Sequence, residues 1–185
     1  MNNERKWILR GGRVLNPAPF CLIGIVNVTP DSFSDGGKYI DPRNAVAHGL
    51  RLLDEGAGML DLGAESTRPF AEPVPEGEEI ARLMPVVARL REQRPDAVLS
   101  VDTLKAGTAR AALEGGADII NDVSACVADP ALLDVLAEYK PGYVLMHSQG
   151  SPREMQVNPR YGNVVEEILA FFEEHLARLV KAGLP

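Results

Sequence analysis

A loop rich in oxygen donors follows the first long apolar run of the sequence. Within residues 27–38, Asn27 offers an amide oxygen, and Asp31 and Asp35 offer carboxylates. Such oxygens are ligands of Mg²⁺ at sites where the ion also binds a phosphate. We therefore regard Asn27, Asp31 and Asp35 as candidate metal ligands. A solvated turn rich in Asp, Ser and Gly has the same composition, so the residues alone leave both interpretations open.

Further side chains with chemical potential follow the later apolar runs. Arg68 can donate two hydrogen bonds to a phosphate or a carboxylate. Asp102 and Asn121 each end an apolar run, and a carboxylate beside an amide can recognise the edge of a planar heterocycle. The alternatives are a surface arginine before a proline turn and two capping residues. We interpret His147, at the end of another run, as a packing residue rather than a general base.

Five apolar runs alternate with five helical patterns, which is typical of βα units around a parallel sheet. The runs are continuous, as in strands that are buried on both faces. We expect strands at residues 20–28, 58–63, 97–102, 118–123 and 142–147. We expect helices at residues 43–55, 76–93, 105–115, 130–138 and 163–182.

Polar residues at the ends of the expected strands favour a (β/α)8 barrel of the TIM type over an open doubly wound sheet, because the carboxyl ends of barrel strands meet at one mouth. They are Asn27, Asp61 with Glu65, Asp102, Asn121 with Asp122, and His147. No G-x-G-x-x-G motif follows the first strand, which argues against a dinucleotide site. Residues 1–19 should form a β-hairpin that turns at Gly11 and Gly12.

Residues 20–185 contain only five βα units, whereas a closed barrel needs eight. We therefore expect an incomplete α/β barrel. Its first and fifth strands would have unpaired apolar edges, which invite pairing with another copy of the chain.

Composition limits the function classes. The 185 residues are 45% hydrophobic, enough for one core, and we treat residues 1–185 as a single domain. A formal net charge of −7 argues against nucleic-acid and anionic-membrane partners. Residues 1–6 do not resemble a secretory signal, so we expect a cytoplasmic protein. The apolar runs are all far shorter than the roughly 20 residues that cross a bilayer.

Taken together, five motifs resemble the successive signatures of the dihydropteroate synthases. They are GIVNVTPDSFSDGG at 24–37, DLGAESTRP at 61–69, SVDT at 100–103, INDV at 120–123, and Met146–His147 with Gln149–Gly150. The first two motifs are long and nearly free of degenerate positions. The fifth departs from the family, because Ser148 stands where a methionine is common.

The resemblance implies a barrel enzyme of folate biosynthesis and a sulfonamide target. Such an enzyme condenses a pterin methyl diphosphate with p-aminobenzoate, with Mg²⁺ near the first loop. By position it implies that substrate is bound by Asn27, Phe33, Thr67, Arg68, Asp102, Asn121 and Met146. It implies catalytic roles for Asp35, Arg68 and Asp102, and a possible homodimer. Loss of diphosphate would leave a cation that a carboxylate can stabilise, and the amine would then attack it.

Two alternatives stay open beside this assignment. In the family, the sixth to eighth strands bring an aspartate, a lysine and an Arg-x-His group that have no counterpart here, so the chain could be a pterin-binding fragment without activity. The pterin-binding domain of a methyltetrahydrofolate methyltransferase is the other alternative, but it lacks the TPDSFSD loop at residues 29–35.

Overall fold

The computed structural model describes residues 6–29, 41–65, 73–150 and 158–184. Its strands are β1 (Trp7–Ile8), β2 (Val14–Leu15), β3 (Ile23–Asn27), β4 (Met59–Gly63), β5 (Leu99–Asp102), β6 (Ile119–Asp122) and β7 (Gly142–Leu145). Its helices are α2 (Pro42–Asp54), α3 (Glu76–Gln93), α4 (Ala106–Glu114), α5 (Leu132–Tyr139) and α6 (Val164–Lys181), with a short 3-10 turn η1 (Arg10–Gly12). All five predicted βα units are present, with bounds within about three residues of the prediction.

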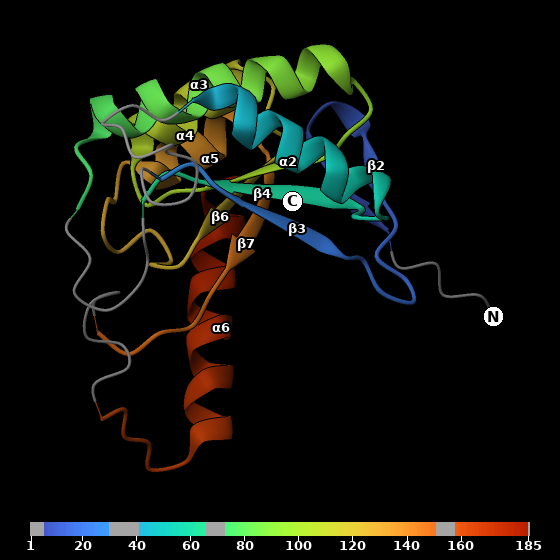
Figure 1. Cartoon of the computed structure of the whole chain (residues 1–185). Helices are drawn as coiled ribbons and strands as arrows, with labels where there is room; N and C mark the ends of the chain where they lie inside the picture. The colour runs from blue at the N-terminus through green and yellow to red at the C-terminus, as the bar shows by residue number, and fades with distance from the viewer. Residues whose placement is uncertain (1–5, 30–40, 66–72, 151–157, 185) are drawn as a thin grey trace.

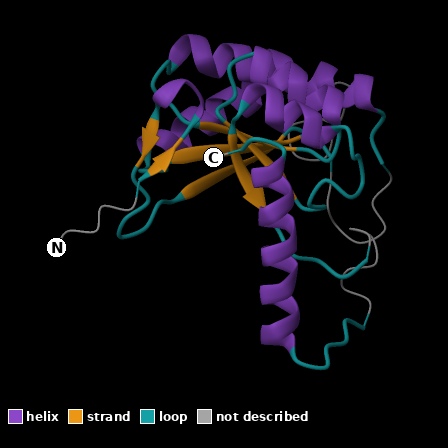
Figure 2. Cartoon of the chain, turned by 180° about the vertical axis from the view of Figure 1, so that it is seen from behind, coloured by secondary structure: helices purple, strands orange, loops and turns teal. Residues whose placement is uncertain are grey.

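The main sheet has the order β3-β4-β5-β6-β7, and every neighbouring pair is parallel. Helices α2 to α5 cover one face of this sheet, whereas α6 projects away from it in both views (Figures 1 and 2). The α/β fold with an incomplete barrel is confirmed. Within the described residues, β3 and β7 are the edge strands, as predicted. Pairing of these edges with another copy stays a prediction.

Alternation along the strands explains where the core lies. Side chains such as Val26 and Leu62 point toward the helices and are fully buried. The opposite face corresponds to the interior of a barrel, and on β3 it is open: Ile23 and Ile25 are 54% and 61% exposed. These side chains lie on the face opposite helices α2 to α5, which accounts for their exposure.

The β1–β2 hairpin covers the amino-terminal end of the inner face. Gly11 and Gly12 both have positive φ, as the predicted turn requires. Leu9 and Leu15 are buried in a cluster with Ile119 and other inner-face residues. A Cβ on Gly142 would lie 2.7 Å from the Leu9 side chain, so the hairpin packs directly on β7. The hairpin therefore plugs one end of the inner face and leaves the carboxyl end of the strands open.

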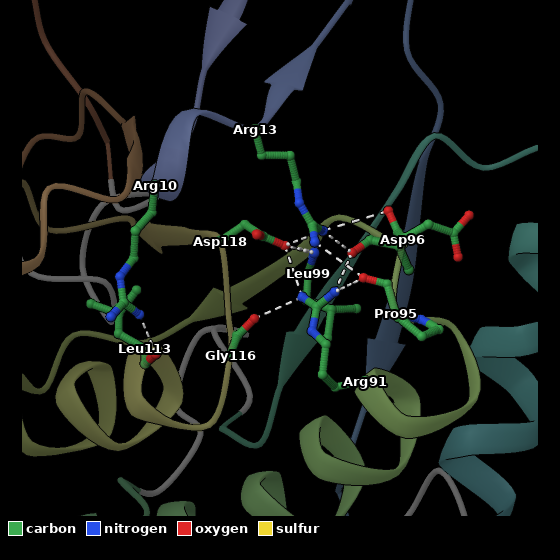
Figure 3. Close-up of polar contacts among 10 residues, drawn as sticks. Arg10, Arg13, Arg91, Pro95, Asp96, Leu99, Leu113, Gly116 and Asp118 are labelled. Carbon is green, nitrogen blue, oxygen red and sulfur yellow. Dashed lines mark hydrogen bonds and ion pairs between the residues drawn. The ribbon is translucent and has the colours of Figure 1, made fainter.

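Arginine side chains connect the hairpin to the segments that precede β5 and β6 (Figure 3). Arg13 and Arg91 both contact Asp118 Oδ2, at 3.4 and 2.9 Å. The same oxygen accepts a hydrogen bond from the Leu99 amide at 3.0 Å, and each arginine also donates to the Ala97 carbonyl at 2.8 Å. Asp118 is 7% exposed. Its charge is thus compensated at the base of the sheet, far from the polar strand ends.

Two details of the helix ends refine the sequence analysis. Asp41 caps α2 through the Arg43 amide at 2.9 Å, with Pro42 at the first helical position. Asp129 instead accepts from Ala131, before α5 begins, and from the first amide of α4 at 2.8 Å. The prediction that Pro130 begins a helix was therefore wrong by two residues: the backbone amides of Leu132 and Leu133 bond to the carbonyls of Asp129 and Pro130, three residues back, and α5 begins at Leu132.

Candidate functional site

Four strand ends place a row of residues across the open mouth of the sheet. The register pairs Asn27 with Gly63, Gly63 with Asp102, and Asp102 with Asn121. Because paired residues on parallel strands lie side by side with side chains on the same face, this row forms one layer of the inner face. Val144 of β7 continues the row beside Asn121. Three predicted site residues, Asn27, Asp102 and Asn121, are therefore brought together.

A second layer lies below the first, and its centre is Asp61. Its Oδ1 accepts a hydrogen bond from Ser100 at 2.6 Å, and its Oδ2 accepts one from Asn121 Nδ2 at 3.0 Å. A carboxylate can only accept, so this contact assigns the nitrogen of the Asn121 amide to Asp61. The amide oxygen of Asn121 is then the acceptor that can meet a ligand.

The sequence analysis counted Asp61 among the polar strand-end residues but gave it no role in the site, and it did not single out Ser100. A signal for both existed, because each is a polar residue inside an apolar run, two positions before the end of its strand. Strand alternation puts Asp61 on the same face as Gly63, and Ser100 on the same face as Asp102. Ser100 is fully buried, so its hydroxyl needs the partner that Asp61 supplies.

Asp102 has an unusual protonation equilibrium. Burial is the main cause, and with the negative charges of Asp61, Glu79, Asp122 and Glu65 it raises the pKa of the carboxyl from 3.8 to about 7. A carboxyl that titrates near neutral pH, in an open site, is typical of functional positions. A ligand that brings N–H donors or positive charge to this layer would stabilise the charged form of Asp102.

Gly63 makes room between the two oxygen donors of the row. A Cβ at this position would lie 3.8 Å from Asp102 Oδ2 and 3.9 Å from Asn27 Oδ1. An amide oxygen and a carboxylate oxygen thus border the space that a side chain at this position would fill. Among the described residues, no group of three or more His, Cys, Asp or Glu side chains could hold a metal by itself. Mg²⁺ commonly uses one or two protein oxygens and substrate phosphates, so Asn27 fits it in that manner.

Five predicted site residues lie outside the described part of the chain: Asp31, Phe33, Asp35, Thr67 and Arg68. Their roles stay predictions. Met146 directly follows β7 and is partly buried. His147 packs against Phe171 with ring centroids 4.8 Å apart, as the interpretation of a packing residue requires.

Residues 23–185 match the family described as pterin-binding enzymes. The chain belongs to this family. The match begins at β3 and runs through all five βα units, so it includes Asn27, Asp102 and Asn121.

Curated relatives with similar sequences are dihydropteroate synthases. The chain is 45% identical over 168 residues to the enzyme of Mycobacterium leprae and 42% identical over 163 residues to that of Haemophilus influenzae. These matches cover 90% and 88% of this chain but 58% of each relative. The resemblance predicted from the sequence is thus confirmed over most of the chain, which spans somewhat more than half the length of these relatives.

Solved structures agree with this placement. A Yersinia pestis dihydropteroate synthase in a sulfonamide drug complex matches with a TM-score of 0.88 and 41% identity, over 98% of this chain and 65% of that chain. A Xanthomonas albilineans enzyme with 7,8-dihydropteroate matches with a TM-score of 0.80 and 42% identity, over 96% and 62%. Another structure of that enzyme contains 4-aminobenzoic acid and has a TM-score of 0.85.

Proposed function

We propose that the chain supplies the pterin pocket of a dihydropteroate synthase, which joins a pterin methyl diphosphate to p-aminobenzoate. The observation that carries this proposal is the row Asn27–Gly63–Asp102–Asn121 at the open end of a sheet from the pterin-binding family. The matched Xanthomonas enzyme binds 7,8-dihydropteroate, the condensation product.

Asp102 and Asn121 would recognise the pterin ring. The carboxylate of Asp102 accepts two neighbouring N–H groups of a flat heterocycle, and such charge-assisted bonds are strong. Asn121, whose Nδ2 is held by Asp61 at 3.0 Å, offers its amide oxygen to a ring donor. Preorganisation of this amide lowers the entropy lost when a ligand binds. Binding would also favour the charged form of Asp102, since ligand donors replace the water lost by burial.

Asn27 would lie at the diphosphate end of the row. Its amide oxygen would hold Mg²⁺, together with Asp31 and Asp35, which follow β3 in the sequence. When bound there, Mg²⁺ would neutralise charge on the leaving diphosphate. Asp35, Arg68 and Asp102 stay the proposed catalytic residues. Asp102 and Asp61 would place negative charge near the methylene carbon of the bound pterin, where positive charge develops as the C–O bond breaks. The amine of p-aminobenzoate would then attack that carbon.

The test is isothermal titration of a pterin methyl diphosphate analogue, with Mg²⁺, into the 185-residue chain and into two variants. Asp102→Ala removes the proposed ring acceptor and should weaken binding at least about 30-fold, the loss expected for a charged hydrogen-bonding partner. Asp96→Ala is the matched control, because its side chain is 81% exposed and lies at the other end of the sheet. It should bind like the unsubstituted chain.

Binding that survives Asp102→Ala would contradict the proposed pocket. A separate assay of diphosphate release, with both substrates present, distinguishes an enzyme from a pterin-binding fragment. We expect the pocket to bind ligand whether or not the chain turns substrate over, because the ring-recognising residues all lie within β4 to β6.

A further inference from the structure

Two cations hold the chain at the point where it leaves β4. Lys105 Nζ contacts the carboxylate of Glu65 and, at 2.7 Å, Oε2 of Glu79 on α3. Arg82, also on α3, donates to the Ala64 carbonyl at 3.0 Å. Lys105 itself comes three residues after the end of β5. The network therefore ties the ends of two neighbouring strands and one helix together, beside the mouth of the sheet.

This network contains a buried carboxylate, whose charge must be compensated within the protein. Glu79 is fully buried, and its Oε2 accepts a second hydrogen bond from Thr108 Oγ1 at 3.1 Å. Within the described part of the chain, its Oε1 has no hydrogen-bond partner. Lys105 supplies the compensating charge. A buried ion pair is weak evidence for stability, but its strict geometry can specify one arrangement of the elements it joins.

Lys105 stays charged at any ordinary pH. Burial alone would lower its pKa, but hydrogen bonds to Glu65 and Glu79, with their negative charges, outweigh burial and raise the pKa above 10.5. Lys105 is therefore a permanent cation between two carboxylates from different elements. Glu65 is the more exposed partner, with 22% of its side chain accessible, against 1% for Glu79. One end of the network is thus anchored in the core, and the other holds the segment that leaves β4.

We propose that Lys105 is a positioning residue that acts through Glu65: it fixes the chain just after β4, two residues before Thr67 in the sequence. The proposal rests on the proposed function, and on the substrate-binding roles that the family resemblance implies for Thr67 and Arg68. Glu79 anchors Lys105 in turn. A fixed exit lowers the entropy lost when the following residues engage an anionic ligand.

The primary variant is Glu65→Gln, because it removes the charge at the exposed end and leaves the Lys105–Glu79 pair intact. Lys105→Met removes the cation, and Lys105→Arg should restore it. Glu55→Gln is the control, since Glu55 lies on the surface in a pair with Arg51. Each variant is titrated with a pterin methyl diphosphate analogue plus Mg²⁺, and with the same pterin lacking the diphosphate.

We expect Glu65→Gln to weaken the diphosphate-bearing ligand about tenfold, which corresponds to about 1.4 kcal/mol. The pterin without diphosphate should change less than about twofold, because Asp102 and Asn121 are untouched. The double variant Glu65→Gln/Lys105→Met should be no weaker than Lys105→Met alone, since both changes remove one contact. If folded Glu65→Gln loses the same affinity for both ligands, or loses affinity for neither, the proposal is overturned.

Hydrogen exchange separates failure of this proposal from failure of the proposed function. If the unsubstituted chain binds neither ligand, the proposed pterin pocket is wrong. The positioning contact is then judged from amide exchange in peptides that cover residues 59–65. Faster exchange there in Glu65→Gln, with unchanged exchange in Glu55→Gln, supports the contact. Equal exchange in both variants overturns it.

Discussion

Replacing Asp102 with asparagine should stabilise the ligand-free fold at neutral and higher pH. Asp102 is the residue that we expect to recognise the pterin, and its surroundings disfavour its charge. Burial and the negative charges of Asp61, Glu79, Asp122 and Glu65 all raise its pKa. Asparagine has nearly the same shape and carries no charge, so the variant removes this unfavourable electrostatic free energy.

The magnitude follows from the pKa. A carboxyl with a pKa of 3.8 when unfolded and about 7 when folded holds its proton more tightly in the fold. Its contribution to stability is fully present below pH 3.8 and is lost as the pH rises through about 7. The gap corresponds to about 4 kcal/mol at most. Relaxation of the open site reduces this free-energy difference. We therefore expect Asp102→Asn to raise the free energy of unfolding by about 2 kcal/mol at about pH 8 and to change it very little at about pH 4.

Urea unfolding of both proteins across this pH range measures the difference directly. The free energies of unfolding of the unsubstituted chain and of Asp102→Asn should differ more and more as the pH rises, with most of the change between about pH 4 and pH 7. A constant offset at every pH would show that the substitution acts through packing. An unsubstituted chain that is the more stable protein at about pH 8 would refute the raised pKa of Asp102.

Three further predictions test the supporting structure. Asp118→Ala should lower the free energy of unfolding by about 3 kcal/mol, because the buried carboxylate compensates two arginines, whereas Asp96→Ala should cost less than about 0.5 kcal/mol in the same urea experiment. Gly142→Ala should cost about 1–3 kcal/mol, since its Cβ would lie 2.7 Å from the hairpin, and an unchanged melting temperature would contradict this packing. Asp61→Asn should lower the pKa of Asp102 below about 7 by removing a neighbouring charge; carbon-detected NMR titration of the carboxyl measures it, and an unchanged pKa would contradict the coupling.

The sequence predicts the order of elements well, because each strand and helix carries its own local signal. Continuous apolar runs indicate buried parallel strands, and capped periodic segments indicate helices. Glu76–Gln93 was predicted with the bounds that α3 has, even though Pro85 lies inside it. The described residues contain no helix long and apolar enough to cross a membrane. The contacts of α6 were less predictable, because a helix with one apolar face does not reveal how much of that face is covered: Leu169 is 57% exposed and Leu176 52%.

Long-range polar contacts were the part that sequence reasoning missed. Lys105 and Glu79 are 26 residues apart, and Arg13 and Asp118 are 105 apart. Neither pair has a periodic signal, since each joins elements that only the tertiary fold brings together. The types of residue at the strand ends could be recognised in advance, but which of them touch depends on the register of the sheet.

Register also explains why the mouth of the sheet can be polar without destabilising the fold. In a closed core, a row containing Asn27, Asp102 and Asn121 would need partners for every donor and acceptor. Here the layer below supplies some of them: Asp61 satisfies Asn121 and Ser100, and its own charge then raises the pKa of Asp102. In the ligand-free chain, the unfavourable electrostatic free energy of this arrangement therefore comes mainly from the charge on Asp102. A pterin whose N–H groups meet that carboxylate would remove the cost, so the same charges that destabilise the empty pocket would favour its occupation.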